Sequence, residues 1–263
     1  MWKKILGLGT PKREKDLVAL YDRVPQEKRP RHIAVIMDGN GRWAEGKGLI
    51  RTAGHRAGVG TLRDILHVCV DLGIEVLTVY AFSTENWKRP RPEVDFLMNL
   101  FSEYLDKKIQ KMDDNHVRLR FLGREDGMSE ALLQKMHAAV DRLAGNDGMV
   151  FNIAANYGGQ DEILRAAQTL AARAKAGEIA PEDIDEDVFE SVLDTAGDPP
   201  VDLVIRTSGD LRLSNFLLWQ AAYAEFWFTK TNWPDFTPEE FVDALVDFAH
   251  RKRRFGGLDP SGK

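Results

Sequence analysis

The chain has 263 residues, 43% hydrophobic and 29% charged, which is the composition of a globular protein with a full core. Its net charge of −5 argues against a nucleic-acid partner, and its single cysteine, Cys69, excludes an internal disulfide or a multi-cysteine metal site. No apolar run reaches the ~18 residues of a membrane span and no secretory signal opens the chain, so we expect a cytoplasmic protein.

The first 31 residues are locally basic, with nine Lys or Arg against four Asp or Glu. A basic segment carrying Trp2 is compatible with peripheral contact to the anionic inner face of a membrane. The alternative, which we favour, is a frayed and solvated tail.

Six apolar runs have the length and composition of buried strands. They cover residues 32–37, 75–82, 117–122, 149–155, 202–206 and 224–229. Helical spacing fills the gaps between them, at 59–72, from Pro92 to Met112, at 129–143 and at 160–176. This alternation predicts a single α/β domain with a mostly parallel six-stranded sheet flanked by helices.

An acidic run at 178–198 holds nine carboxylates and no base, and its weak amphipathic pattern predicts a solvated helix face. The stretch 216–228 is richer in aromatic residues than one helix–strand junction needs, which also suggests a subunit interface.

The first strand ends on Asp38, followed by Gly39, Asn40, Gly41 and Arg42. In open α/β sheets ligands bind at this carboxyl edge, where glycines permit close backbone approach. The segment 48–63 supplies more cations and can begin a helix, which is a natural seat for a phosphate group. A simple strand–loop–helix turn is the alternative.

Two further polar segments leave predicted strands, at 82–90 and 204–215. In the second, Arg206 and Arg212 stand six residues apart with hydroxyls between them, which predicts a second anion site and hence two phosphorylated ligands. Ordinary polar turns are the alternative for both segments.

Glu225 stands alone among aromatic residues, so it should be paired, bound to a metal or at an edge. One reading is that it shares a Mg²⁺ ion with Asp38, and the other is a buried ion pair with an arginine.

Together these segments resemble the cis-prenyltransferase family, most closely its bacterial members, over about residues 31–257. The resemblance rests on 37–43 (MDGNGRW), 54–55 (GH), 82–90 (FSTENWKRP), 152–159 (NIAANYGG), 206–209 (RTSG), 214–220 (SNFLLWQ), 223–225 (YAE), 233–234 (WP) and 253–257 (RRFGG). It implies a catalytic domain at 31–257 between an N-terminal segment, 1–30, and a tail, 258–263.

The resemblance implies a homodimer with an apolar tunnel. It also implies Mg²⁺-dependent condensation of isopentenyl diphosphate units onto farnesyl diphosphate, each new double bond being cis. We expect a C55 product, undecaprenyl diphosphate, the precursor of a lipid carrier for cell-wall synthesis. Shorter and longer products stay open, because they depend on side chains at the tunnel floor, such as Met149, Phe151, Leu100 or Leu105.

Carried over by position, the metal residues are Asp38 and Glu225, and the catalytic residues are Asp38 and Asn86. An amide is a poor base, so we interpret Asn86 as an orienting group, with released diphosphate as the proton acceptor. The allylic diphosphate cradle comprises Gly39, Asn40, Gly41, Arg42, Arg51 and His55. Further substrate contacts are Trp43, Ser83, Thr84, Glu85, Trp87 and Arg89. The isopentenyl diphosphate site comprises Arg206, Arg212, Leu213 and Ser214, and Arg254 and Gly256 can reach the partner subunit's site.

Two other classes of function were weighed. A phosphohydrolase with Asp38 as nucleophile would need a second aspartate two residues later. Asn40 occupies that position, so this reading is weak. A non-catalytic partner subunit would lack the aspartate and arginines that this chain keeps. No P-loop or dinucleotide-binding glycine motif is present.

Overall fold

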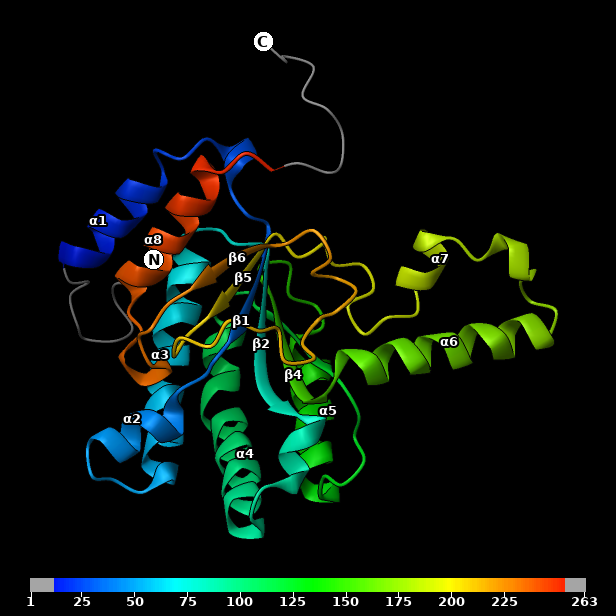
Figure 1. The fold of residues 1–263 in the computed structure, drawn as a ribbon, viewed down its shortest axis with the longest axis horizontal. Helices are drawn as coiled ribbons and strands as arrows, with labels where there is room; N and C mark the ends of the chain where they lie inside the picture. Colours follow the sequence, from blue (N-terminus) through cyan, green and yellow to red (C-terminus); the bar gives the residue numbers. More distant parts are fainter. Residues whose placement is uncertain (1–11, 254–263) are drawn as a thin grey trace.

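A computed structural model describes residues 12–253, with side chains from residue 16 onward. Six strands form one sheet in the order β3-β4-β2-β1-β5-β6, and every neighbouring pair is parallel (Figure 1). The strands are β1 His32–Ile36, β2 Val76–Ser83, β3 Arg118–Leu122, β4 Val150–Tyr157, β5 Leu203–Arg206 and β6 Glu225–Phe228. All six predicted strands and the α/β fold class are confirmed.

Helices lie on both faces of this sheet. They are α1 Lys12–Tyr21, α2 Asn40–Gly46, α3 Arg51–Asp71, α4 Arg91–Asp113, α5 Glu130–Leu143, α6 Gly159–Lys175, α7 Glu186–Glu190 and α8 Pro238–His250. Short 3₁₀ turns are η2 Gln26–Lys28, η3 Thr84–Lys88, η4 Pro181–Asp183 and η5 Trp233–Asp235. The two patterns expected at 48–63 and 59–72 belong to one helix, α3.

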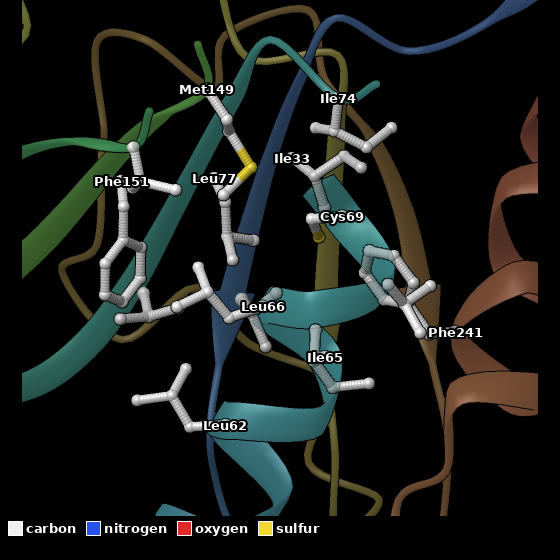
Figure 2. Packing of buried hydrophobic residues seen from close by; sticks show 14 of the residues in the cluster. Ile33, Leu62, Ile65, Leu66, Cys69, Ile74, Leu77, Met149, Phe151 and Phe241 are labelled. Atoms are coloured by element: carbon white, nitrogen blue, oxygen red, sulfur yellow. The ribbon is translucent and has the colours of Figure 1, made fainter. Parts of the chain in front are cut away.

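The larger core lies between α3 and the sheet. Leu62, Ile65 and Leu66 of α3 belong to one buried cluster with Leu77 and Phe151 of the central strands (Figure 2). Cys69, on the same helix face, is fully buried, so the prediction of a core thiol is confirmed. Apolar residues spaced three or four apart explain this packing, because they share one side of a helix.

The opposite face of the sheet is covered by the chain between β5 and β6. Phe216 and Leu217 are fully buried there, against Ala34 and Ala154 of the sheet. The Phe216 ring stacks on Tyr80 of β2, with 4.5 Å between ring centroids. The aromatic stretch at 216–228 therefore contributes to the core, a role that is additional to any contact between subunits.

The prediction of a frayed N-terminal tail is wrong for the part of the segment whose side chains are described. Leu17, Tyr21 and Val24 are buried in the main core, and α1 packs against α8. Trp2 lies outside the described residues. Sequence analysis also overlooked α8, although Thr237 before Pro238 is a helix start signal, and the Thr237 hydroxyl accepts a hydrogen bond from the Glu240 N–H.

The acidic run at 178–198 is only partly solvated, which corrects the prediction of an exposed helix face. The helical part of the run is the short α7. Asp198 is buried and pairs with Arg120 at 2.8 Å, and Asp194 pairs with Arg165 at 2.7 Å. These carboxylates fasten the loop before β5 to the sheet and to α6.

A buried polar chain crosses the sheet at His32. Its Nδ1 lies 2.8 Å from the Pro199 carbonyl and its Nε2 2.7 Å from the Thr78 hydroxyl, which also accepts from Asn152. The carbonyl can only accept, so Nδ1 carries the proton and Nε2 accepts from Thr78. Burial, the largest cause, lowers the pKa of His32 below its ordinary value, so the neutral ring is the native form.

This neutral histidine makes folding sensitive to acid. As the pH falls, His32 is protonated first in the unfolded chain, near its ordinary pKa of 6.5. The stability that neutral His32 contributes to the folded state is therefore complete above that pH and is lost below it. We expect at most about 1.4 kcal/mol of stability to be lost per pH unit below that point. Urea unfolding at pH 7.5 and 5.5 measures it, and an equal pH dependence in His32→Gln would contradict it.

Candidate active site

The carboxyl ends of the strands surround a cavity of about 480 Å³. Parallel strands bring their C-terminal residues to one sheet edge, so segments far apart in sequence meet here. The polar lining comes from all three predicted segments: Asp38, Asn40, His55, Ser83, Glu85, Asn86, Arg89, Arg206, Ser214 and Asn215. The prediction that these segments form one site is supported by their shared cavity.

Asp38 lies at the centre of a cluster of charges. Its Oδ2 accepts from Arg206 at 2.8 Å and lies 3.1 Å from Arg42. Its Oδ1 accepts from the Gly39 N–H at 2.7 Å. Arg42 in turn bonds the Ser208 carbonyl and pairs with Asp210 at 3.0 Å. The carboxylate is therefore held by arginines from two different strand ends.

The electrostatics of the cluster keep Asp38 ionised. Burial alone would raise the pKa of this carboxyl group, but the hydrogen bond from Arg206 and the nearby charge of Arg42 outweigh it and lower the pKa below its ordinary value. The negative charge is thus available at neutral pH for a cation or for orienting the arginines.

Arg206 is the most buried cation at the site, with a side chain 4% exposed. It bonds Ser214 Oγ at 2.7 Å and the Arg212 carbonyl, while its Nε has no hydrogen-bond partner among the described residues. A buried guanidinium N–H without a partner is costly unless a ligand accepts from it. Arg206 therefore has a donor to spare for an anion in this cavity.

Arg212 and Leu213 occupy different places from Arg206. The Arg212 side chain is 63% exposed and pairs with Asp210 at 3.0 Å, outside the cavity lining. The Leu213 side chain packs against the smaller apolar cluster and does not line the cavity.

A second group of basic side chains, two arginines and a histidine, is organised by Glu93, which sequence analysis missed. This carboxylate lies 3.3 Å from His55, 3.1 Å from Arg89 and 3.7 Å from Arg51. It follows Pro92 in the first turn of α4, four residues after Arg89, and that spacing was its only signal in the sequence. Glu93 thus gathers three of the predicted phosphate contacts.

His55 is neutral in this arrangement. Burial lowers its pKa, and the charges of Arg89 and Arg51 lower it further against the opposing effect of Glu93. At neutral pH it acts through hydrogen bonds, and the positive charge comes from the arginines.

The loop after β2 is held by its own capping interactions. Ser83 and Asn86 form a capping box in which the Ser83 side chain accepts from the Asn86 N–H and the Asn86 Oδ1 accepts from the Ser83 N–H at 3.1 Å. Burial alone raises the pKa of Glu85, but hydrogen bonds from its own N–H and from Asn215 lower it overall. Thr84 does not line the cavity.

Two residues predicted as aromatic substrate contacts, Trp43 and Trp87, do not line the cavity. The indole N–H of Trp43 bonds Asp235 at 2.7 Å. The indole N–H of Trp87 bonds Asn156 at 2.7 Å, and its ring packs on Phe82. Neither Trp43 nor Trp87 lines the cavity, so both buttress the loops that carry the site.

Gly39 stands where only glycine fits without strain, and Gly41 lets the backbone lie close to Arg51. Gly39 has a φ of 99°, and a Cβ there would lie 2.4 Å from the Asn232 side chain. A Cβ on Gly41 would lie 2.7 Å from the Arg51 guanidinium carbon. These positions let the α2 backbone approach the cations, as the sequence predicts.

Glu225 is not brought to this edge of the sheet. The register sets Glu225 opposite Leu203, and Leu203 opposite Ile33, at the start of β1, about 16 Å from the level of Asp38 at ~3.3 Å per residue. Glu225 pairs instead with Arg251 at 2.9 Å. The expectation that one chain shares a metal between Asp38 and Glu225 is therefore wrong, and the alternative ion pair is what forms.

A divalent cation fits the site only with help from its ligand. Among the described residues no group of three or more His, Cys, Asp or Glu side chains is placed to hold a metal. Mg²⁺ is often held by one or two carboxylates together with substrate phosphates. Asp38 supplies such a carboxylate, and Asp210, which shares Arg42 and Arg206 with it, lies close by.

A narrower apolar cavity of about 120 Å³ continues from the polar one between α3, α4 and the sheet. The two share residues at their junction, including Met37, His55 and Leu97. The deeper lining is apolar, with Leu100, Phe101, Tyr104 and Ile153 among its members. A ligand that fills both cavities must be anionic at one end and hydrocarbon at the other.

The fold and this divided site are those of an α/β protein whose ligand has an anionic head and an apolar tail. Residues 36–256 match the family described as "Putative undecaprenyl diphosphate synthase". The chain is 47% identical to an isoprenyl transferase of Heliobacterium mobile, over 98% of this chain and 99% of that protein. It is 51% identical to a Vibrio cholerae ditrans,polycis-undecaprenyl-diphosphate synthase named as (2E,6E)-farnesyl-diphosphate specific, over 88% and 92%.

Solved structures of two prenyl diphosphate synthases have the same fold as this chain. Lavandulyl diphosphate synthase from Lavandula x intermedia, in complex with dimethylallyl diphosphate, superposes with a TM-score of 0.85 at 36% identity, covering 88% of this chain and all of that one. A probable undecaprenyl diphosphate synthase from Campylobacter jejuni gives 0.73 at 35% identity, covering 87% and 99%. The chain belongs to the undecaprenyl diphosphate synthase family of cis-prenyltransferases, and it is a prenyltransferase.

Proposed function

We propose that this enzyme condenses isopentenyl diphosphate units onto farnesyl diphosphate, with Mg²⁺, to give C55 undecaprenyl diphosphate for the lipid carrier of cell-wall synthesis. The observation that carries the proposal is that Asp38 lines one polar cavity together with Arg206, His55 and Arg89, and that this cavity continues into an apolar one. The name of the Vibrio cholerae relative supports the choice of primer.

In this proposal the two cation groups bind different diphosphates. The cluster of His55, Arg89 and Arg51 lies beside the apolar cavity, which suits an allylic diphosphate whose hydrocarbon tail enters it. Arg206 and Ser214 line the polar cavity but not the apolar one, which suits isopentenyl diphosphate. Holding two reactants in one orientation removes much of the entropic barrier to their reaction.

The chemistry needs no protein nucleophile. The isopentenyl double bond attacks the allylic carbon as its diphosphate departs, and the adduct then loses a proton to the released diphosphate. Arginines fixed before the reaction stabilise the charge that develops on the departing diphosphate. When bound at Asp38, Mg²⁺ would neutralise more of that charge. Asn86 orients the loop after β2, since its amide caps η3.

The apolar cavity is proposed as the start of the product tunnel, and its depth should set product length. Leu100 lies one helical turn beyond Leu97, the residue shared with the polar cavity. Leu100→Trp is expected to block the path and shorten the main product by several isoprene units. Thin-layer sizing of the dephosphorylated product measures this. Leu164→Trp, on the exposed side of α6, is the matched control, and an unchanged product from Leu100→Trp would count against the tunnel.

The homodimer is proposed on the exposed edge of the sheet. β6 is an edge strand, Phe228 and the nearby Tyr223 are exposed, and an unpaired apolar edge favours association. The predicted contribution of Arg254 and Gly256 to the partner subunit's site lies outside the described residues. A role for Glu225 in a metal site is compatible with this fold only across such a contact.

The remaining expectations concern location and boundaries. No helix in the described part of the chain has the length and apolarity to cross a membrane. Cytoplasmic location, peripheral membrane contact and the domain boundaries at 30 and 257 stand as proposals from the sequence.

Incubation with farnesyl diphosphate, labelled isopentenyl diphosphate and Mg²⁺ tests the proposal. Butanol-extractable long-chain product supports it, and chelation of the metal should abolish product formation. Release of free phosphate would favour the phosphohydrolase alternative, and absence of turnover would favour a non-catalytic subunit. Sizing the product distinguishes C55 from shorter or longer chains.

A further inference from the structure

Asn215 lies where three segments of the site meet. It follows Ser214 in the loop after β5. Its side chain contacts Glu85 in the loop after β2 and Gln160 in the first turn of α6, the helix that follows β4. It lines the polar cavity. The family resemblance described above assigns it no role, so its contacts alone indicate what it does.

The first contact is a helix cap supplied from a distant part of the chain. Gly158 is the N-cap residue of α6 and has no side chain with which to cap it. Asn215 supplies the cap instead. Its backbone carbonyl accepts a hydrogen bond from the Gly159 N–H at 2.7 Å, and its side-chain Oδ1 accepts one from the Gln160 N–H at 2.8 Å. Both N–H groups belong to the first turn of a helix, where they lack partners within the helix.

The second contact joins the two ligand loops. Asn215 Nδ2 donates to Glu85 Oε1 at 3.0 Å. Gly158 makes room for this bridge, because a Cβ there would lie 2.8 Å from Asn215 Nδ2 and 2.9 Å from Thr84 Oγ1. One amide therefore connects the loop of Ser214 to the loop of Glu85.

The backbone beside Asn215 needs such support. Ser214, Asn215 and Leu217 have φ values of 53°, 63° and 45°, in the left-handed region that non-glycine residues rarely adopt. Such conformations persist only where surrounding contacts fix them, and asparagine tolerates them better than most residues. The same turn presents Ser214 Oγ to Arg206 at 2.7 Å.

We propose that Asn215 is a positioning residue, which holds Ser214 and Arg206 in the arrangement that receives the second diphosphate and fixes Glu85 opposite them. This inference rests on the proposed function for the identity of that ligand, isopentenyl diphosphate. It assigns to one amide the mechanical link between the loops on the two sides of the cavity.

Asn215→Gly removes both side-chain contacts and keeps the backbone conformation, because glycine adopts positive φ freely. The KM for isopentenyl diphosphate is expected to rise about tenfold, with kcat and the KM for farnesyl diphosphate changed less than about twofold. A variant with unchanged KM for isopentenyl diphosphate would overturn the inference. So would an equal loss in all three constants that parallels a fall in melting temperature, because that pattern indicates only a structural role.

An exchange of donor and acceptor tests the bridge itself. Asn215→Asp keeps the cap on α6 but sets a carboxylate against Glu85, and is expected to raise the same KM at least tenfold. In the Glu85→Gln background the new amide can donate to the new carboxylate, so adding Asn215→Asp there should cost less than about threefold. An equal cost in the two backgrounds would overturn the proposed bridge.

Calorimetric titration with inorganic diphosphate separates this inference from the proposed function. The affinity of the Asn215→Gly variant should be about tenfold weaker than that of the unchanged enzyme, whether or not the enzyme elongates prenyl chains. Failure of elongation by the unchanged enzyme would overturn the proposed function, whereas equal diphosphate affinities would overturn the role of Asn215.

Discussion

Asp38→Asn is expected to lower kcat by about a thousandfold while the protein stays folded. Asparagine has nearly the same shape, can still accept from the Gly39 N–H, and leaves an oxygen facing Arg206. The negative charge is lost, and with it the group that fits a divalent cation at the diphosphate. Single-turnover chemistry with labelled isopentenyl diphosphate measures the loss, and circular dichroism with thermal melting measures the fold.

Asp210→Asn is the matched control for this prediction. Asp210 contacts the same two arginines, at 3.0 Å from Arg42 and 3.5 Å from Arg206, but it does not line the cavity. Its loss should disturb the arginines and reduce kcat by about tenfold. If Asp38→Asn retained more activity than Asp210→Asn, the central role of Asp38 would be wrong.

The predictable part of the site is the part that depends on strand ends. Asp38 and Arg206 each follow or end an apolar run of strand length, so a parallel sheet brings them to one edge whatever the intervening sequence. The sequence also predicts a close backbone approach at Gly39 and Gly41, although an ordinary turn would use the same glycines, and the structure has the close approach.

Glu225 shows where this reasoning fails. A lone carboxylate among aromatic residues indicates that the group needs a partner. The residue type does not indicate whether the carboxylate lies at the beginning or at the end of its strand. Glu225 begins β6, and in a parallel sheet that places it on the edge opposite Asp38. Its partner, Arg251, comes from the end of α8, a helix that the sequence reading had missed.

Glu93 and Asn215 were missed for another reason. Each acts through contacts with residues distant in sequence, Glu93 with His55 on α3 and Asn215 with Glu85 on the loop after β2. Periodicity and turn chemistry describe neighbours along the chain, so they carry no signal for such pairs. Trp43 and Trp87 were predicted wrongly for the converse reason: they lie near the site in sequence, but they line neither of its cavities.

Arg206→Lys is expected to raise the KM for isopentenyl diphosphate about a hundredfold, with a smaller fall in kcat. The side chain is buried, and its planar fork reaches Asp38 and Ser214 at once while Nε stays free. Lysine keeps the charge and can still pair with Asp38, so the fold should survive. It cannot reproduce several donors in one plane, which is the geometry that suits phosphate oxygens.

Arg212→Lys provides the comparison, because the same substitution is made at an exposed position. The Arg212 side chain is 63% exposed and pairs with Asp210, so water screens its charge and its conversion should raise the same KM only a fewfold. Steady-state kinetics with isopentenyl diphosphate as the varied substrate separates the two. Equal effects of the two substitutions would show that burial of Arg206 is not what makes it the principal anion ligand, and the second diphosphate would then have to bind nearer the surface, at Arg212 and Asp210.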